Sequence, residues 1–175
     1  PISTRDLEEL ASLSEGNYTL AVVVTDDAGN SGSDFVTFTI DTTPPLAPNV
    51  GTAGTTPSPT SSNSPTWYWT STDGNGTFRY SLDGDPDTGP WSAETISTDF
   101  TALGITHGVH TLYVQERDDA SNWSLSGFYP INVDLLAPTV SLMQPSGWVK
   151  TATPFAQWSE EGTGTSISAR EFHVV

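Results

Sequence analysis

The sequence predicts an all-β protein built from tandem copies of one small β-domain. Thr, Ser, Gly, Pro and Asn are abundant while Leu, Lys and Glu are sparse, which favours strands and turns over helices. The motif Thr25-Asp26-Asp27-Ala28-Gly29-Asn30 returns 92 positions later as Arg117-Asp118-Asp119-Ala120-Ser121-Asn122. Each copy lies between two alternating apolar strands. A repeat of this length matches one small β-domain, so we expect a tandem array.

The first hairpin precedes a proline-rich linker. Alternation predicts strands at 18–24 and 35–41, joined by the acidic turn. Residues 1–14 are less regular, with room for one or two helical turns over 6–13. Residues 42–48 form a stiff linker in this interpretation, because prolines fix φ and favour extended backbone.

The middle of the chain holds a fuller copy. Residues 50–64, rich in Thr, Ser, Pro and Gly, have little to bury and are predicted as a loop. Predicted strands follow at 66–70 and 77–82, around 95–97, at 110–115 and at 128–134.

Residues 137–158 repeat the start of that fuller copy. Ala137-Pro138-Thr139-Val140 matches Ala47-Pro48-Asn49-Val50, and Thr153-Pro154-Phe155-Ala156-Gln157-Trp158 matches Ser64-Pro65-Thr66-Trp67-Tyr68-Trp69. Residues 137–158 therefore align with the N-terminal half of the central copy, and the first hairpin aligns with its C-terminal half.

This register predicts a complete domain at 43–135, the C-terminal half of a domain at 1–42 and the N-terminal half of another at 136–175. Neither half is expected to bury its apolar face alone. Two explanations stay open. The chain is a segment of a longer array, or the halves of successive copies complete each other by strand complementation and build a filament.

The charge and cysteine content narrow the classes of partner. With 21 acidic and 5 basic residues the net charge is −16, which repels nucleic acid and anionic membranes and suits a surface that collects divalent cations. The absence of Cys excludes a disulfide scaffold and thiolate metal sites. No apolar run reaches the ~20 residues of a membrane span, and any export signal is expected outside this segment.

Two stretches resemble the bacterial immunoglobulin-like repeats of very large cell-surface and adhesin proteins. One runs from Glu15-Gly16-Asn17-Tyr18 through the first acidic turn to Asp41-Thr42-Thr43-Pro44-Pro45, and the other covers 108–124. The resemblance implies β-sandwiches of about seven strands, export to the cell surface or medium, and often Ca²⁺ at domain junctions. Two departures weaken the second junction, since Ser121 replaces the usual Gly and Leu135-Leu136 replaces Thr42-Thr43.

Two acidic sets are candidate Ca²⁺ ligands, because Ca²⁺ takes carboxylate, amide and carbonyl oxygens. The first set is Asp26, Asp27, Asn30 and Asp41, and the second is Asp118, Asp119, Asn122 and Asp134. We expect each set to converge between consecutive domains. Spacing alone is equally explained by turn chemistry, with Asp and Asn capping backbone donors and Gly taking φ > 0. The resemblance favours a metal at the first set.

A third acidic segment spans Asp83 to Gly89, with Glu94 beyond it. Four of its positions match an EF-hand loop, but Thr88 stands where Gly is needed and the flanks are strands. An acidic, solvated hairpin loop is the preferred interpretation.

The sequence predicts no enzyme. No nucleophile elbow, Cys nucleophile, zinc-protease motif or phosphate loop is present, and His107, His110 and His173 are isolated.

The tryptophans divide into two groups. Trp67 and Trp69 share one strand face and Trp158 repeats Trp69, which predicts core positions. Trp91, Trp123 and Trp148 lie beside turns, where exposed rings grip sugars or cover sheet ends.

The resulting hypothesis is a structural repeat segment of a bacterial surface protein, an adhesin stalk or filament stiffened by Ca²⁺. Its partners are neighbouring Ig-like domains or copies of itself, with carbohydrate or a host surface bound through other parts, and neither nucleic acid nor a membrane. The alternatives are a carbohydrate-binding β-sandwich that uses Trp91 or Trp123, and a strand-complemented filament subunit.

Overall fold

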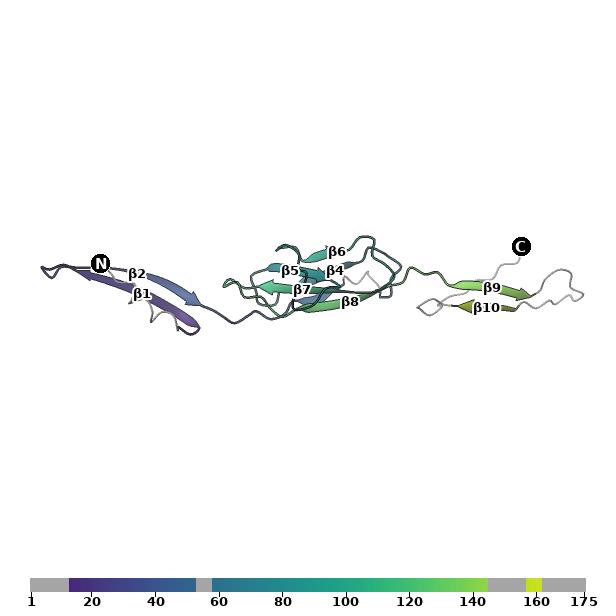
Figure 1. Ribbon diagram of the computed structural model, residues 1–175, viewed down its shortest axis with the longest axis horizontal. Coiled ribbons are helices and arrows are strands. Elements are labelled where there is room, and N and C mark those ends of the chain that lie inside the picture. The colour runs from purple at the N-terminus through teal and green to yellow at the C-terminus, as the bar shows by residue number, and fades with distance from the viewer. Residues whose placement is uncertain (1–12, 53–57, 145–156, 162–175) are drawn as a thin grey trace, which may run out of the picture.

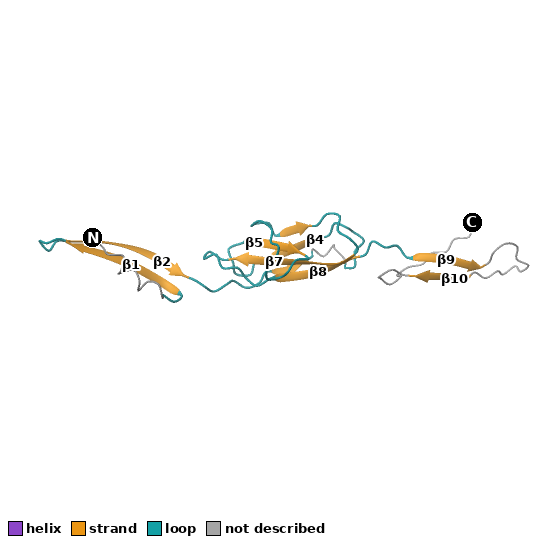
Figure 2. Cartoon of the chain, in the orientation of Figure 1, coloured by secondary structure: helices purple, strands orange, loops and turns teal. Residues whose placement is uncertain are grey.

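The computed structural model describes residues 13–52, 58–144 and 157–161, which are strand, turn or loop throughout (Figure 2). The predicted all-β character is confirmed. Ten strands in this described part pair antiparallel into four sheets. The β1–β2 pair, the central region with two of the sheets, and the β9–β10 pair follow one another along the long axis (Figure 1). The strands are β1 (Gly16–Thr25), β2 (Ser31–Ile40), β3 (Asn49–Gly51), β4 (Thr66–Thr70), β5 (Thr77–Leu82), β6 (Asp99–Thr101), β7 (Gly108–Arg117), β8 (Gly127–Val133), β9 (Thr139–Gln144) and β10 (Gln157–Glu161).

The β1–β2 hairpin pairs without a break from Gly16↔Ile40 to Thr25↔Ser31. Side chains of directly paired residues point to the same face, so the even-numbered positions of both strands share one face. That face carries the apolar pairs Tyr18↔Phe38 and Leu20↔Val36, and the two rings of the first pair stack with centroids 5.7 Å apart.

The central region contains two three-stranded sheets, β3–β4–β6 and β5–β7–β8. Their apolar residues meet in one buried core, as expected for two sheets packed face to face. Trp67 (0% exposed) and Trp69 (2%) project from β4 into this core, so their predicted core positions are confirmed. The β7–β8 side contributes Leu112, Val114, Ile131 and Val133, each 0% exposed.

Two sequence expectations differ from the structure in this region. The strand expected around 95–97 is only an isolated bridge between Thr95 and Phe78. Ser97 turns the chain through its hydroxyl, which donates to the Asp99 carboxylate at 3.0 Å, and β6 starts there. β3 extends into the stretch predicted as a loop, because three residues are too few for alternation to be visible.

Beyond β8, β9 and β10 form a second two-stranded pair, with an irregularity between Gln157 and Trp158. The expected helical turns over 6–13 fall almost wholly outside the described residues, as do Trp148 and His173. The described part of the chain contains no helix long and apolar enough to cross a membrane.

Candidate functional site

The linker after β2 is anchored to one end of the central sheets. The Asn122 side-chain amide donates a hydrogen bond of 3.1 Å to the carbonyl of Asp41, and the Leu46 amide donates one of 2.7 Å to the Asp73 carboxylate. Asn122 lies in the turn between β7 and β8, and Asp73 in the turn between β4 and β5. Two turns of the central region therefore hold the linker. We call this contact region, made by Asp41, Leu46, Asp73 and Asn122, the junction.

A buried carboxylate holds the second of these turns in place. Glu116 on β7 is 0% exposed and accepts hydrogen bonds from the Ser71 hydroxyl (2.6 Å), the Thr72 amide (3.2 Å) and the Gly76 amide (3.0 Å). The Thr72 hydroxyl in turn donates to the carbonyl of Ala47 in the linker at 2.9 Å. A buried charge needs such partners, so Glu116 couples the junction to the core.

Sequence reasoning missed Glu116, although a signal was present. It occupies an alternating inward position on β7, and Val24 stands at the matching position of the first copy. A charged residue at a position that the pattern assigns to the core indicates a specific polar partner.

The two acidic turns have the same hydrogen bonds. In each, the first Asp accepts from the backbone amide (2.8 Å) and the side-chain amide (2.9 Å) of the Asn four residues later, as Asp26 does from Asn30 and Asp118 from Asn122. The residue directly before the Asn has positive φ, 88° for Gly29 and 75° for Ser121. The turn-chemistry interpretation therefore describes what these carboxylates contact.

These hydrogen bonds favour the ionised carboxylates. The Asn30 side-chain amide, followed by its backbone amide, lowers the pKa of Asp26. Desolvation acts in the opposite direction at Asp118, but the hydrogen bonds from Asn122 outweigh it and lower the pKa of that group as well. Both turns are thus held by an anionic Asp at neutral pH.

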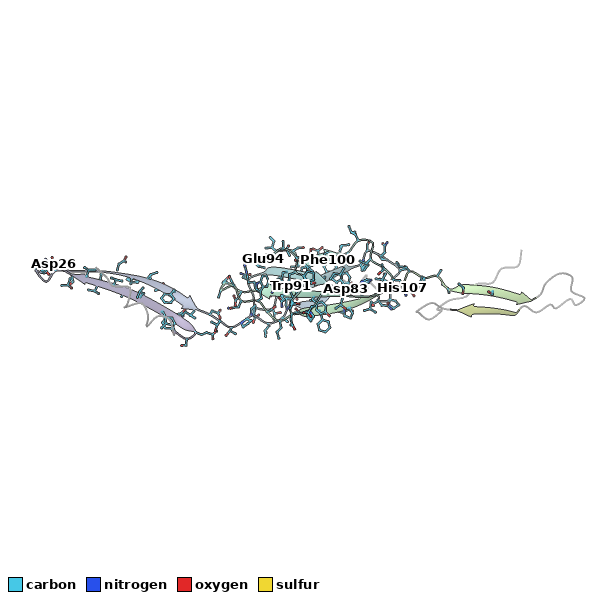
Figure 3. The ribbon with its side chains drawn as sticks, viewed as in Figure 1. Asp26, Asp83, Trp91, Glu94, Phe100 and His107 are labelled. Atoms are coloured by element: carbon cyan, nitrogen blue, oxygen red, sulfur yellow. The ribbon has the colours of Figure 1, made fainter. Side chains whose placement is uncertain are left out.

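The structure separates members of each predicted Ca²⁺ set. Asp26 lies at the far tip of the hairpin in Figure 3, while Asp41 follows the other end of β2. Ten residue pairs lie between them, a distance of about 30 Å. Asp134 is separated from Asp118 in the same way by the length of β8. One repeat therefore cannot bring its own turn and its own strand end to one ion.

The junction instead combines residues of two successive repeats, Asp41 from the first and Asn122 beside Asp118 from the second. Asp27 and Asp119 lie in their turns and are exposed. Among the described residues, no three His, Cys, Asp or Glu side chains gather closely enough to hold a metal ion. The Ca²⁺ ligand set stays a prediction.

The chain makes the same Asp turn after β2 and after β8, but a different side chain contacts the residues that follow it in each copy. The carboxylates of Asp41 and Asp134 each accept from the amide two residues later, at 3.0 and 3.1 Å. In the first copy Glu15 accepts from Thr42 and from the Thr43 hydroxyl, the latter at 2.6 Å. These bonds, that from Thr43 first, lower the pKa of Glu15.

In the second copy His107 stands at the position of Glu15, and its Nδ1 lies 3.4 Å from Asp134 and 3.4 Å from the amide of Leu135. Where Leu135-Leu136 replaces Thr42-Thr43, the residue that contacts this segment changes as well, from Glu15 to His107.

The EF-hand-like segment uses its carboxylates for local bonds. Asp85 Oδ1 accepts from the amides of Asp87 (2.9 Å) and Thr88 (2.8 Å), and Glu94 pairs with Arg117 at 3.0 Å. Asp83 has positive φ (55°) and accepts from the Thr111 amide at 2.7 Å. These contacts favour the solvated hairpin loop over a metal loop.

His110 bridges two groups beside that loop. Its Nδ1 lies 2.6 Å from Asp83 Oδ2 and its Nε2 lies 2.9 Å from the carbonyl of Thr106. Both partners are acceptors, so the doubly protonated ring satisfies both. Burial lowers the pKa of His110, and the hydrogen bonds to Asp83 and Thr106 outweigh it, so the net pKa is raised.

The tryptophans proposed for sugar contact enclose an arginine. The Arg79 guanidinium lies 4.8 Å from the ring centre of Trp91 and 4.2 Å from that of Trp123. Both rings are half-buried, and Arg79 also donates to the Gln115 side chain at 2.6 Å. Ring faces stacked on Arg79 are occupied by a cation–π contact.

Comparison of the chain with protein-family models and with curated proteins gives no match.

Proposed function

We propose that this chain is a structural, extracellular repeat segment of a bacterial surface protein, part of an adhesin stalk or filament. In this proposal residues 43–135 form one immunoglobulin-like β-sandwich, and residues 1–42 and 136–175 belong to neighbouring domains of the same type. Neighbouring domains are its direct partners, and adhesion to carbohydrate or a host surface belongs to other parts of the protein.

The observation that carries the proposal is the recurrence of one hairpin. β1–β2 pairs from Gly16↔Ile40, and β7–β8 pairs from Gly108↔Val133, which are the matching residues of the two copies. The acidic turns share their hydrogen bonds as well. Repetition of a whole structural unit along one chain is typical of arrays that bridge distance.

The entry and exit of the central region support a stalk. The linker enters beside the start of β8, where a Cβ added to Gly127 would collide with the carbonyl of Pro48. The chain leaves at the other end of β8, beside His107 and Asp134. Entry and exit at opposite ends support an arrangement of successive domains in line, and in Figure 1 the β1–β2 and β9–β10 pairs lie on opposite sides of the central region.

Ca²⁺ at the junction remains part of this proposal. Its support is the acidic character of the chain and the contact between Asp41 and the second acidic turn. An ion bound only by the native junction would raise the melting temperature by mass action. Calorimetry in Ca²⁺ and in excess chelator tests this role, and equal melting temperatures would contradict it.

Small-angle X-ray scattering of the dilute chain tests the stalk itself. We expect a rod whose largest dimension is several times its cross-section, and a compact particle would contradict the proposal. Cell-surface location is tested separately, because a protease added to intact producing cells should cleave an exported segment and leave a cytoplasmic control protein uncut.

A further inference from the structure

We propose that the contact between residues 58–60 and the end of β8 is a clamp that bears tension along the chain. The inference rests on the stalk function proposed above. It goes further in naming the bonds that carry the load and the step at which the central region gives way.

The clamp is a short parallel contact between two segments that are far apart in the sequence. Thr60 forms a parallel bridge with Val133. The Thr60 amide donates to the carbonyl of Asn132 at 2.9 Å, and the Asp134 amide donates to the carbonyl of Thr60 at 2.8 Å. The Asn132 amide donates to the Ser58 hydroxyl at 3.0 Å. Thr60 is 6% exposed, so little water reaches these bonds.

The clamp joins the segment through which the chain enters the central region to the strand through which it leaves. The chain enters at the start of β8, where the Pro48 carbonyl approaches Gly127, and leaves at the other end of β8. Because the bridge is parallel, residues 58–60 run in the same direction as β8, which lies nearly along the long axis in Figure 1. Tension therefore pulls residues 58–60 toward the start of β8 and pulls β8 itself the opposite way.

The direction of this load decides how the bonds break. Backbone hydrogen bonds between paired strands lie across the strands. A pull along the strand axis therefore loads the bonds of the clamp in shear and together, whereas a pull across the strands would open them one after another. On its other edge β8 pairs with β7 from Gly108↔Val133 to Val114↔Gly127, and this ladder is loaded in the same way.

The clamp also shields the chain between its two halves. Tension that crosses from Thr60 to Val133 passes directly between the two segments and bypasses residues 61–132. β3 precedes the clamp and is loaded first, but its ladder, Asn49↔Thr70 to Gly51↔Tyr68, joins it to β4 rather than to the exit strand. Rupture of the clamp is therefore the step that exposes the rest of the central region to load.

A second bridge in the central region makes nearly the same bonds but has no place in this load path. The Thr95 amide donates to the carbonyl of Phe78 at 2.9 Å, and the Phe78 amide donates to the carbonyl of Thr95 at 2.8 Å. The hydroxyl oxygens of Thr60 and Thr95 each accept from the amide two residues later, at 3.1 and 3.0 Å. Phe78 belongs to β5, which is neither the entering segment nor the exit strand. Thr95 is therefore a matched control for Thr60.

Single-molecule measurements on the full 175-residue chain, held through its two ends at constant force, test the clamp. Forced unfolding is governed by the unfolding rate, which this experiment reads directly. Unfolding of the central region is recognised by the largest gain in length, since each released residue adds up to about 3.5 Å and residues 43–135 outnumber either flanking part.

Two substitutions compare the clamp with the control bridge. Thr60→Pro and Thr95→Pro each remove one backbone donor. Under tension we expect the clamp to be broken in the transition state and the Thr95 bridge to be intact there. Thr60→Pro should therefore speed unfolding at constant force about tenfold, and Thr95→Pro should change the rate by less than about twofold. Chemical denaturation without force should show a loss of stability in both variants, so a merely structural role would move both forced rates alike.

Ser58→Ala is a milder variant that leaves the backbone bonds of the clamp in place. It removes the hydroxyl that accepts from the Asn132 amide and should speed forced unfolding about threefold. If Thr60→Pro does not fold, Ser58→Ala decides the question alone. Equal acceleration by the two proline variants, or an unchanged rate in Ser58→Ala, would overturn the clamp. The stalk function fails separately, through a compact particle in the scattering experiment.

Discussion

The β1–β2 and β7–β8 hairpins share a sequence pattern, a turn and a pairing register but differ in burial. Val22 is 42% exposed, whereas its counterpart Val114 is 0% exposed. The difference does not lie in the hairpins themselves. β7 is flanked by β5 and faces the β3–β4–β6 sheet, while β1 has only β2 beside it in the described residues. Local sequence thus sets pairing and turn, and the opposing sheet sets the core.

The largest expected loss of stability comes from removing Trp67, whose ring packs the opposing sheet against β8 in the central region. Trp67→Ala deletes a fully buried ring and its bond to Tyr129, and should destabilise the central region by about 3–5 kcal/mol. Chemical denaturation measures this loss. The matched control is Tyr68→Ala on the outward face of β4, where the ring is 43% exposed and a much smaller loss is expected.

Two reciprocal substitutions at matching positions, Glu116→Val on β7 and Val24→Glu on β1, test whether only the central region needs a carboxyl group there. Glu116→Val leaves the Ser71 hydroxyl and the Thr72 and Gly76 amides without their acceptor, at an expected cost of about 1–3 kcal/mol. Val24→Glu, at a position 61% exposed, should change the unfolding free energy by under about 0.5 kcal/mol. Equal costs in the two denaturation curves would contradict this account of the junction.

Substitutions at Gly29 and Ser121, which directly precede the Asn of each acidic turn, test whether the two turns share one backbone conformation. Ser121 has φ of 75°, a region in which Gly carries no Cβ penalty. Ser121→Gly should stabilise the central region by about 1 kcal/mol, and Gly29→Ser should weaken the first hairpin by a similar amount. Melting curves report the first change, and amide exchange in β1 and β2 reports the second. A loss of stability in Ser121→Gly would show that the serine makes a compensating contact.

His110 provides the smallest and most selective test. Because its folded pKa is raised, the stabilisation is fully present below its unfolded pKa of about 6.5 and is lost as pH rises through the folded value. Tyr18 occupies the matching position, and its hydroxyl donates to the carbonyl of Ser14, just as His110 contacts Thr106. His110→Tyr should keep that bond and flatten the stability profile above pH 6. An unchanged profile would assign the dependence to another group.

The sequence predicted the hairpins well because alternation and Asp/Asn/Gly turns are local signals. The strands predicted at 66–70 and 77–82 agree with β4 and β5, which lie in different sheets, and both repeats of the hairpin are identified. It also predicted Trp67 and Trp69 in the core, because two rings on one strand face need a common environment.

Contacts between residues far apart in the chain could not be predicted from sequence spacing. Asp41 was expected beside Asp26, but antiparallel pairing puts a turn and the end of its second strand at opposite ends of a hairpin. The contact between Asp41 and Asn122 joins residues 81 positions apart, which spacing within one repeat cannot reveal. The buried hydrogen bonds of Glu116 were missed for the same reason, since its partners lie about 40 positions away in another turn.

Hydrogen exchange measured separately for the two hairpins of one chain, at a concentration that keeps it monomeric, tests the central claim most directly. The account predicts strong protection of the β7–β8 amides and much weaker protection of the β1–β2 amides, because among the described residues only the former are covered by a second sheet. Equal protection of the two hairpins in the monomer would contradict it.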